Sequence, residues 1–123
     1  MLLKDFYTIQ SFESNDGGKY VATIMLNKDH DVFKGHFPGN PVTPGVCMMQ
    51  IIKELTQEAV KAPLIMKSAS NIKFMALINP EVNPLLRLEL DITSTDDAVI
   101  KVKNTSYFDE TVALKLSCIY SKN

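Results

Sequence analysis

Features that mark secreted, metal-binding and membrane-spanning proteins are scarce in this sequence. It has two cysteines, Cys47 and Cys118, and both sit within apolar patterns, where we expect buried thiols in a reducing compartment. Neither cysteine has the spacing of a zinc site, and we expect no metal ion and no cofactor. The N-terminal residues contain no long apolar stretch of the kind found in signal peptides, and no run reaches the length of a membrane span. A cytoplasmic protein is therefore expected.

An excess of charge of one sign is also lacking. The 13 basic and 14 acidic side chains leave a formal net charge of −1, so we expect neither nucleic acid nor a membrane as a partner. The sequence shows no internal repeat, low-complexity tract or linker. Its 123 residues are 46% hydrophobic, which is enough for one core, and we expect a single domain over residues 1–123.

The region between Thr43 and Pro63 predicts one long helix. Thr43 is a favourable N-cap, Pro44 suits the first helical position, and Pro63 disfavours continuation beyond about Lys61. Apolar residues recur at helical spacing on one face: Met48, Ile51, Ile52, Leu55 and Ala59. The first turns are apolar nearly all round, so we expect the helix to be buried at its start and more solvated towards its end.

Most of the remaining chain alternates between apolar and polar residues. Residues 19–26 form a strand candidate after a turn signal, and further candidates lie at 71–78, 86–93, 98–107 and 112–120. The polar segment 27–40 contains His30, for which we expect an exposed loop position. Short connections predict an antiparallel meander with one covered face. The pattern therefore indicates an α+β fold in which an antiparallel sheet wraps around the long helix.

The segment 35–46 is the most distinctive part of the chain. It places His36 in a loop rich in glycine and proline directly before the predicted helix. Proline fixes φ and glycine permits unusual backbone angles, so such a loop can hold its side chain in one place. An imidazole titrates near neutral pH, which makes His36 a candidate general acid or base. From spacing alone, a loop histidine without a catalytic role is the alternative interpretation.

The residues from His36 to Val46 resemble the signature His-Phe-Pro-Gly-x-Pro-Val-x-Pro-Gly-Val of the β-hydroxyacyl-acyl-carrier-protein dehydratases. This family belongs to the hot-dog superfamily, and the order of elements elsewhere in the chain fits it. The resemblance implies a hot-dog fold and a 3-hydroxyacyl thioester substrate of fatty-acid or polyketide-type lipid metabolism, carried by an acyl carrier protein or by CoA. It also implies that His36 is the base and that the Gly45 backbone N–H binds the thioester carbonyl.

The chain departs from the family at the second catalytic position. The family places a Glu or Asp fourteen residues after the histidine, where this chain has Gln50. A glutamine amide forms hydrogen bonds but cannot lend a proton as a carboxylic acid does. Close relatives often read Glu-x-x-x-Gln here, and this chain has the same residue types exchanged, with Glu54 one helical turn further on. Glu54 is thus either a replacement acid or an ordinary solvated helix residue.

Several apolar side chains are candidates for lining an acyl channel, although each of them also suits an ordinary core. The candidates are Phe33, Met48, Met49, Ile52, Phe74 and Met75, and Phe37 and Val46 are further candidates for substrate binding. In the family two protomers join their sheets edge to edge, and each active site borrows residues across the interface. The resemblance therefore implies a homodimer, a heterodimer with a complete hot-dog subunit, or a higher oligomer.

Three functions remain open from the sequence. The first is a dehydratase-like lyase whose reaction is weak because the acid is missing. The second is a non-catalytic or partner-dependent hot-dog subunit that keeps the acyl cleft. The third is an acyl thioesterase in which Glu54 activates water.

Overall fold

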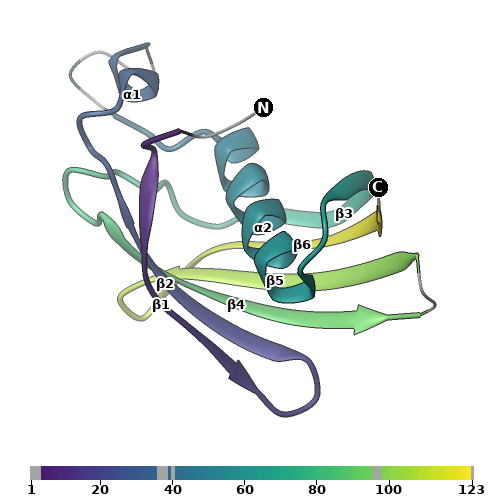
Figure 1. Cartoon of the computed structure of the whole chain (residues 1–123). Coiled ribbons are helices and arrows are strands. Elements are labelled where there is room, and N and C mark those ends of the chain that lie inside the picture. The colour runs from purple at the N-terminus through teal and green to yellow at the C-terminus, as the bar shows by residue number, and fades with distance from the viewer. Residues whose placement is uncertain (1–3, 36–38, 40, 96–97, 123) are drawn as a thin grey trace.

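A six-stranded antiparallel sheet dominates the computed structural model, which describes residues 4–35, 39, 41–95 and 98–122 (Figure 1). The strands follow the order β1-β2-β4-β5-β6-β3 across the sheet. Their bounds are β1 Tyr7–Asn15, β2 Lys19–Leu26, β3 Leu64–Phe74, β4 Leu85–Ser94, β5 Val99–Phe108 and β6 Thr111–Lys122. Strands β4, β5 and β6 form the predicted meander, whereas β3 lies at the far edge and pairs with β6.

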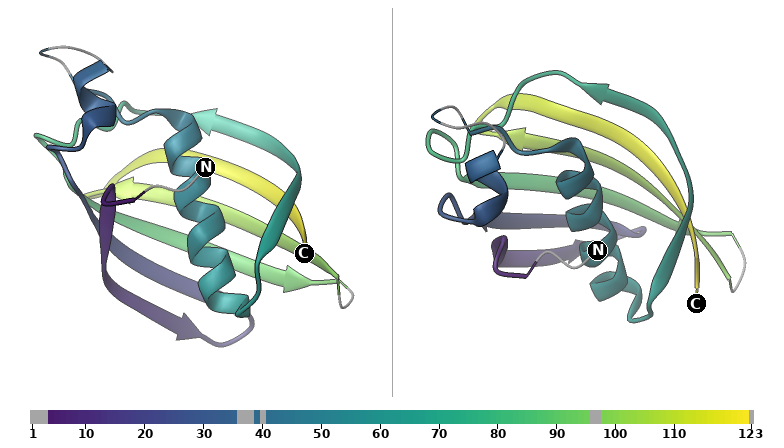
Figure 2. Two further views of the ribbon diagram at one scale, coloured as in Figure 1. Left: turned by 45° about the horizontal axis from the view of Figure 1, so that its top comes forward. Right: turned by 90° about the horizontal axis from the view of Figure 1, so that it is seen from above.

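The long helix α2 (Gly45–Val60) lies in the concavity of the sheet, whose strands curve around it (Figure 2). Its apolar face supplies Ile51, Ile52 and Leu55, each with 0% exposure. Alternate residues of the sheet meet this face, because successive side chains of a strand point to opposite sides. Leu86, Leu88 and Leu90 of β4 are accordingly buried. The predicted α+β hot-dog architecture is confirmed.

Three elements differ from the sequence prediction. Strand β1 was not predicted, because its residues are mostly exposed and show no apolar alternation. Strand β3 begins at Leu64, directly after Pro63, and not near residue 71. A short helix α1 (Asp31–Gly35) lies in the polar segment 27–40, where no helix was predicted.

A glycine turn closes the hairpin between β1 and β2. Gly17 and Gly18 have φ angles of 76° and 80°, in the region that favours glycine. Gly18 also lies against the backbone carbonyl of Ile92, where a Cβ atom would collide, and its own carbonyl accepts a hydrogen bond from the Ile92 N–H. The hairpin places β1 and its first residue, Tyr7, alongside α2.

Among the described residues, no helix combines the length and the apolar character that crossing a membrane requires. Both cysteines are free and buried, as predicted.

Candidate functional site

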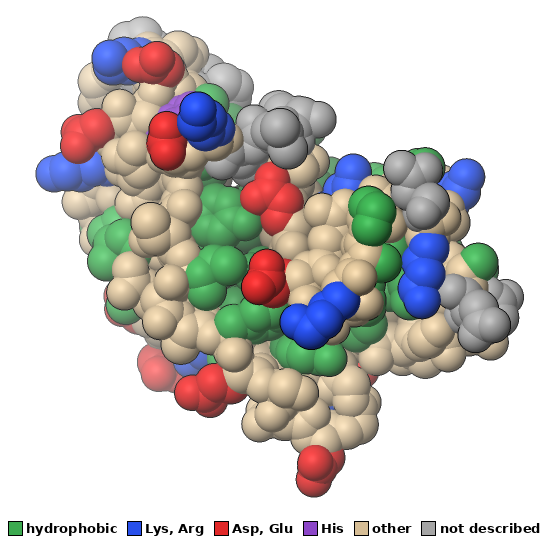
Figure 3. Space-filling view, viewed as in Figure 1, with side chains coloured by type: hydrophobic (Ala, Val, Ile, Leu, Met, Phe, Trp, Pro, Cys, Tyr) green, Lys and Arg blue, Asp and Glu red, His purple; other side chains and the backbone are tan. Residues whose placement is uncertain are grey.

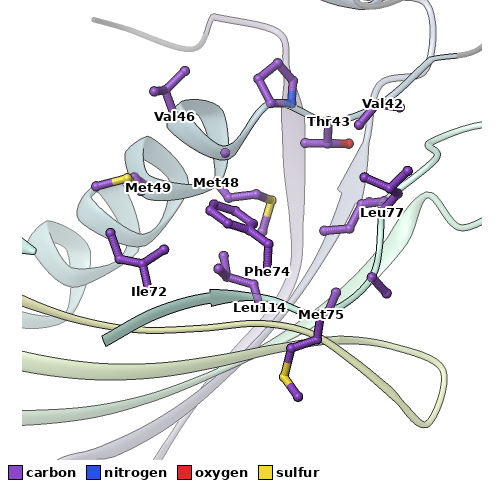
Figure 4. Close-up of a pocket in the computed structure, with 15 residues that line it drawn as sticks. Val42, Thr43, Val46, Met48, Met49, Ile72, Phe74, Met75, Leu77 and Leu114 are labelled. Atoms are coloured by element: carbon purple, nitrogen blue, oxygen red, sulfur yellow. The ribbon is translucent and has the colours of Figure 1, made fainter. Parts of the chain in front are cut away.

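An apolar cavity of about 760 Å³ opens at the amino end of α2, between this helix and strand β3 (Figure 4). Its walls come from the segment before α2, the first turns of α2, the end of β3 with the loop that follows, and β6. The residues that line it are Val42, Thr43, Pro44, Gly45, Val46, Met48, Met49, Ile72, Phe74, Met75, Ala76, Leu77, Ile78, Ala113 and Leu114. Thr43 alone among these side chains carries a polar group.

Gly45 and Phe74 lie against each other in this wall. A Cβ atom added to Gly45 would lie 2.6 Å from Cζ of the Phe74 ring, so a side chain here would displace the ring. Phe74 itself is 60% exposed, although it is a large aromatic residue. The glycine thus lets an aromatic ring pack directly on the first turn of the helix.

The amino end of α2 keeps free backbone donors beside the cavity. Cys47 and Met48 donate their N–H groups to the carbonyl of Pro44, at 3.1 and 3.2 Å. The N–H groups of Gly45 and Val46 have no acceptor in the described part of the chain. Such donors, together with the helix dipole, favour an anionic or carbonyl oxygen.

The predicted capping arrangement at Thr43 is wrong. Pro44 occupies the N-cap position, and no side chain caps the helix. The Thr43 N–H donates to the Ile78 carbonyl at 2.9 Å, which ties the residue to the loop that follows β3. Its hydroxyl is consequently buried without a hydrogen-bond partner among the described residues.

A second polar cluster joins Gln50 and Glu54 of α2 to Tyr7 of β1. The Tyr7 O–H donates to Oε1 of Glu54 at 2.8 Å, and Nε2 of Gln50 donates to Oε2 at 2.9 Å. Both oxygens of the Glu54 carboxylate therefore hold a donor. Burial raises the pKa of Tyr7 well above its usual range, and the hydrogen bond to Glu54 and the charges of Glu54 and Glu58 add to this effect. In the view of Figure 3, acidic side chains stand beside apolar ones over the region between β1 and α2.

The candidate site residues from the sequence fall into three groups. Gly45, Val46 and Phe74 line the cavity. Gln50 and Glu54 belong to the Tyr7 cluster and do not line it. His36 and Phe37 lie outside the described residues.

The apolar candidates divide in a similar way. Met48, Met49 and Met75 line the cavity, whereas Phe33 and Ile52 are core residues with 4% and 0% exposure. Sequence reasoning missed Tyr7 and the buried hydroxyl of Thr43. The apolar composition of residues 72–78 was a usable signal for the β3 wall, but no signal marked Tyr7.

His30 has a more defined position than the exposed loop site that was predicted. Its Nδ1 accepts from the Val32 N–H at 3.1 Å, and its Nε2 lies 2.9 Å from the Lys4 carbonyl. The ring packs edge-on against Phe6, with centroids 5.1 Å apart. His30 therefore links the start of α1 to the N-terminal segment. These contacts give it a structural role.

Comparison with solved structures defines the fold class. The backbone matches the dehydratase heterocomplex ApeI:P from Xenorhabdus doucetiae with a TM-score of 0.75 and 19% identity, over 94% of this chain and 97% of that one. The protein is thus a hot-dog-fold protein, and its sequence relatives narrow this class to one family.

The sequence relatives are dehydratases. The chain is 32% identical over 113 residues to the 3-hydroxyacyl-acyl-carrier-protein dehydratase FabZ of Lactobacillus helveticus, covering 82% of this chain and 72% of the relative. It is 29% identical over 102 residues to FabZ of Caulobacter sp. strain K31, covering 76% of this chain but 60% of the relative's length. The family model described as ApeI-like, ApeI dehydratase, matches residues 12–113, and the chain belongs to this dehydratase family.

Proposed function

We propose that this protein binds a 3-hydroxyacyl thioester on an acyl carrier protein and acts as a dehydratase-like subunit of cytoplasmic lipid synthesis. The observation that carries the proposal is the apolar cavity of about 760 Å³ beside the free N–H groups at the start of α2. An acyl chain is complementary to the apolar walls, and a thioester oxygen is complementary to the donors. The FabZ relatives, which act on acyl-carrier-protein thioesters, support this substrate class.

The proposed reaction is the elimination of water across C2 and C3 of the acyl chain. His36 takes the proton from C2, and the electrons of that C–H bond form the C2–C3 double bond. The C3–O bond breaks, and the departing oxygen leaves as water once it receives a proton. Charge gathers transiently on the thioester oxygen, which the Gly45 N–H stabilises.

The proposed mechanism lacks a carboxylic acid in this chain to protonate the departing oxygen. Gln50 takes the place of the family's carboxylic acid and cannot supply it. Positioned acids contribute roughly 10²–10⁴-fold to such reactions, so we expect slow dehydration by this chain alone. A hot-dog partner that carries the carboxylate in its own helix is the proposed source of full activity.

Strand β3 is the proposed contact with that partner. Its outer edge has no neighbouring strand among the described residues, and Ile65 and Ile72 on it are 43% and 41% exposed. Pairing of two β3 edges joins the sheets of two protomers and brings the cavity, which β3 borders, next to the second chain. The partner is either a second copy or a complete hot-dog subunit.

The thioesterase alternative has less support. It requires Glu54 to activate water beside the thioester, yet Glu54 does not line the cavity and both its oxygens hold donors from Tyr7 and Gln50. The dehydratase relatives also favour elimination over hydrolysis.

An activity assay tests the proposal. Purified protein, alone and with candidate hot-dog partners, is given a 3-hydroxyacyl and a saturated acyl thioester on both acyl carrier protein and CoA. We expect binding of both chains, slow dehydration by the protein alone, and a rate at least 10²-fold higher for Gln50→Glu.

Three outcomes contradict parts of the proposal. Fast dehydration that Glu54→Gln abolishes makes Glu54 the acid. Fast dehydration that survives Glu54→Gln points to an acid outside both positions. Hydrolysis of the saturated thioester establishes the thioesterase alternative.

A further inference from the structure

A hollow with a basic lining lies on the outer face of the sheet, the face turned away from α2. Its volume is about 220 Å³, and it spans the neighbouring strands β3, β6 and β5. No Asp or Glu lines it among the described residues. The lining side chains that are not buried are Asn71, Lys73, Lys103, Thr105, Lys115 and Ser117. This lysine hollow thus combines three positive charges with two hydroxyl groups and no negative charge.

The strand register brings these lysines together without neutralising them. Lys73 of β3 stands directly opposite Lys115 of β6, and Lys115 stands directly opposite Thr105 of β5. Directly opposed residues share a face of the sheet, with Cβ atoms about 4.5–5.5 Å apart, and like charges in such pairs are destabilising. None of the three lysines forms an ion pair with a described residue. The repulsion within the hollow is therefore left for a bound anion to relieve.

Acidic side chains on the same face lie on β4, beside the hollow. Asp91 is the register partner of Lys103, but no ion pair joins the two side chains. The Glu89 carboxylate accepts from the Tyr107 O–H at 3.3 Å and lies 3.7 Å from Nε of Arg87. The carboxylates of β4 therefore leave the charge over β3, β6 and β5 uncompensated.

An irregularity in β3 shapes one wall of the hollow. The pairing of β3 with β6 shifts register between Ser70 and Lys73, and Asn71 has a φ of 52°, which asparagine tolerates better than most residues. Bulges of this kind re-aim side chains. Asn71 and Lys73 line the hollow, whereas Ile72 between them lines the apolar cavity. The two sites thus share β3 but lie on opposite faces of the sheet.

We propose that the lysine hollow binds a phosphate dianion, either free or as the terminal group of a small metabolite. Its ammonium groups supply positive charge from three strands. The Thr105 and Ser117 hydroxyls have no hydrogen-bond partner in the described part of the chain and supply neutral donors. A phosphate dianion has enough charge and acceptor oxygens to engage all of these strands at once, and a carboxylate has fewer. The proposal is independent of acyl binding, and pairing of two β3 edges leaves this face open.

Titration with inorganic phosphate, followed by the NMR shifts of backbone amides, tests the proposal. Sodium chloride keeps the ionic strength constant, so screening is the same at every point. We expect saturable binding, with the largest shifts at Lys73, Thr105 and Ser117. Dimethyl phosphate, which carries a single charge, should bind at least about 5-fold more weakly.

Glycerol 3-phosphate separates the two sources of the dianion. An affinity equal to that of inorganic phosphate supports a phosphorylated metabolite as the ligand. An affinity at least about 10-fold weaker supports the free anion, because the hollow then has no room for the ester group.

Substitutions distinguish the hollow from a general effect of charge. Lys73→Met and Lys115→Met should each weaken phosphate binding about 5-fold, the scale of one exposed charge pair, and the double variant should not saturate. Lys115→Arg keeps the charge and should retain binding. Lys101→Met is the matched control, because Lys101 is an exposed residue of β5 two positions before Lys103 and does not line the hollow. Its affinity should stay within about 2-fold of the natural sequence.

Competition with an octanoyl-pantetheine thioester locates the bound phosphate. We expect none, because the apolar cavity and the hollow lie on opposite faces. Competition, or shifts centred on Gly45 and Val46, places the phosphate at the start of α2 and overturns the proposal. Unsaturable binding, full affinity in the double variant, or an equal loss in Lys101→Met also overturns it. Each of these results leaves acyl binding untouched, and failure of the thioester to bind counts against the proposed function alone.

Discussion

Tyr7 is a residue whose chemistry depends on the fold. Its hydroxyl is held against a carboxylate, and burial is the largest cause of its raised pKa. The protonated phenol is therefore favoured by the folded chain more than by the unfolded chain. In the unfolded chain a tyrosine loses its proton near pH 10.

This difference predicts how stability responds to alkali. Below pH 10 both states keep the Tyr7 proton, and its contribution to stability is fully present. Above pH 10 the unfolded state releases the proton first, so the free energy of unfolding should fall as the pH rises. Urea denaturation between pH 8 and 11 measures this for the natural sequence and for Tyr7→Phe.

The advantage of the natural sequence over Tyr7→Phe should be constant below pH 10 and should shrink above it. Other groups that titrate in alkali affect both proteins and cancel in the difference. A difference that grows above pH 10 contradicts the assigned hydrogen bond.

Helix stability and ligand binding place different demands on Gly45 at the start of α2. Alanine in place of an interior glycine stabilises a helix by up to about 1 kcal/mol, and the gain is smaller at Gly45 because it is the first residue of α2. A methyl group at Gly45 also collides with the Phe74 ring. Phe74 is 60% exposed and can move aside. Gly45→Ala should therefore change the free energy of unfolding by less than about 1 kcal/mol, while octanoyl-thioester affinity falls at least 10-fold because the methyl group obstructs the Gly45 N–H.

Phe74→Ala provides the comparison. In a Phe74→Ala background, Gly45→Ala should be more favourable for stability than in the natural sequence, since no ring is displaced. The affinity loss should persist, since the N–H remains obstructed. Recovery of full affinity in the double variant shows that the displaced ring, and not the obstructed N–H, caused the loss.

Helix α2 and the meander were predictable because their signals are local. The run of Ile51, Ile52 and Leu55 has helical spacing, and the alternating leucines of β4 have strand spacing. The cavity was predictable in part, since Gly45 and Val46 lie in a recognisable motif.

The contact between Tyr7 and Glu54 was not predictable. Tyr7 comes from an edge strand without apolar alternation, and it meets Glu54 only because the hairpin at Gly17–Gly18 returns beside α2. Nothing near either residue in the sequence encodes that contact.

The N-cap prediction at Thr43 failed for a tertiary reason. The local sequence favours Thr43 as the N-cap. Its backbone N–H instead donates to the Ile78 carbonyl, in the loop after β3. Pairing with a segment 35 positions away outweighs a preference worth about 1 kcal/mol.

Association of protomers through β3 is open to a direct test. Light scattering at micromolar concentration should report a dimer or larger assembly, either of this chain or with its hot-dog partner. The double substitution Ile65→Lys and Ile72→Lys places charge on the β3 edge that is proposed to contact the partner. It should therefore release monomers. Lysine at Met25, a 37% exposed residue of the interior strand β2, is the control and should leave the assembly intact. A monomer in the natural sequence, with or without partner, excludes this edge as an interface.

The irregular backbone of β3 bears on how the chain avoids fibrous aggregation. Its pairing with β6 shifts register between Met66 and Ser68 and again between Ser70 and Lys73, with Asn71 at a φ of 52°. A long, flat, apolar edge is a template on which any extended peptide can stack. The two interruptions divide this edge into short runs that fit a strand with matching bends. The register shifts thus make β3 a poor seed for amyloid, although its edge position leaves it open to one partner.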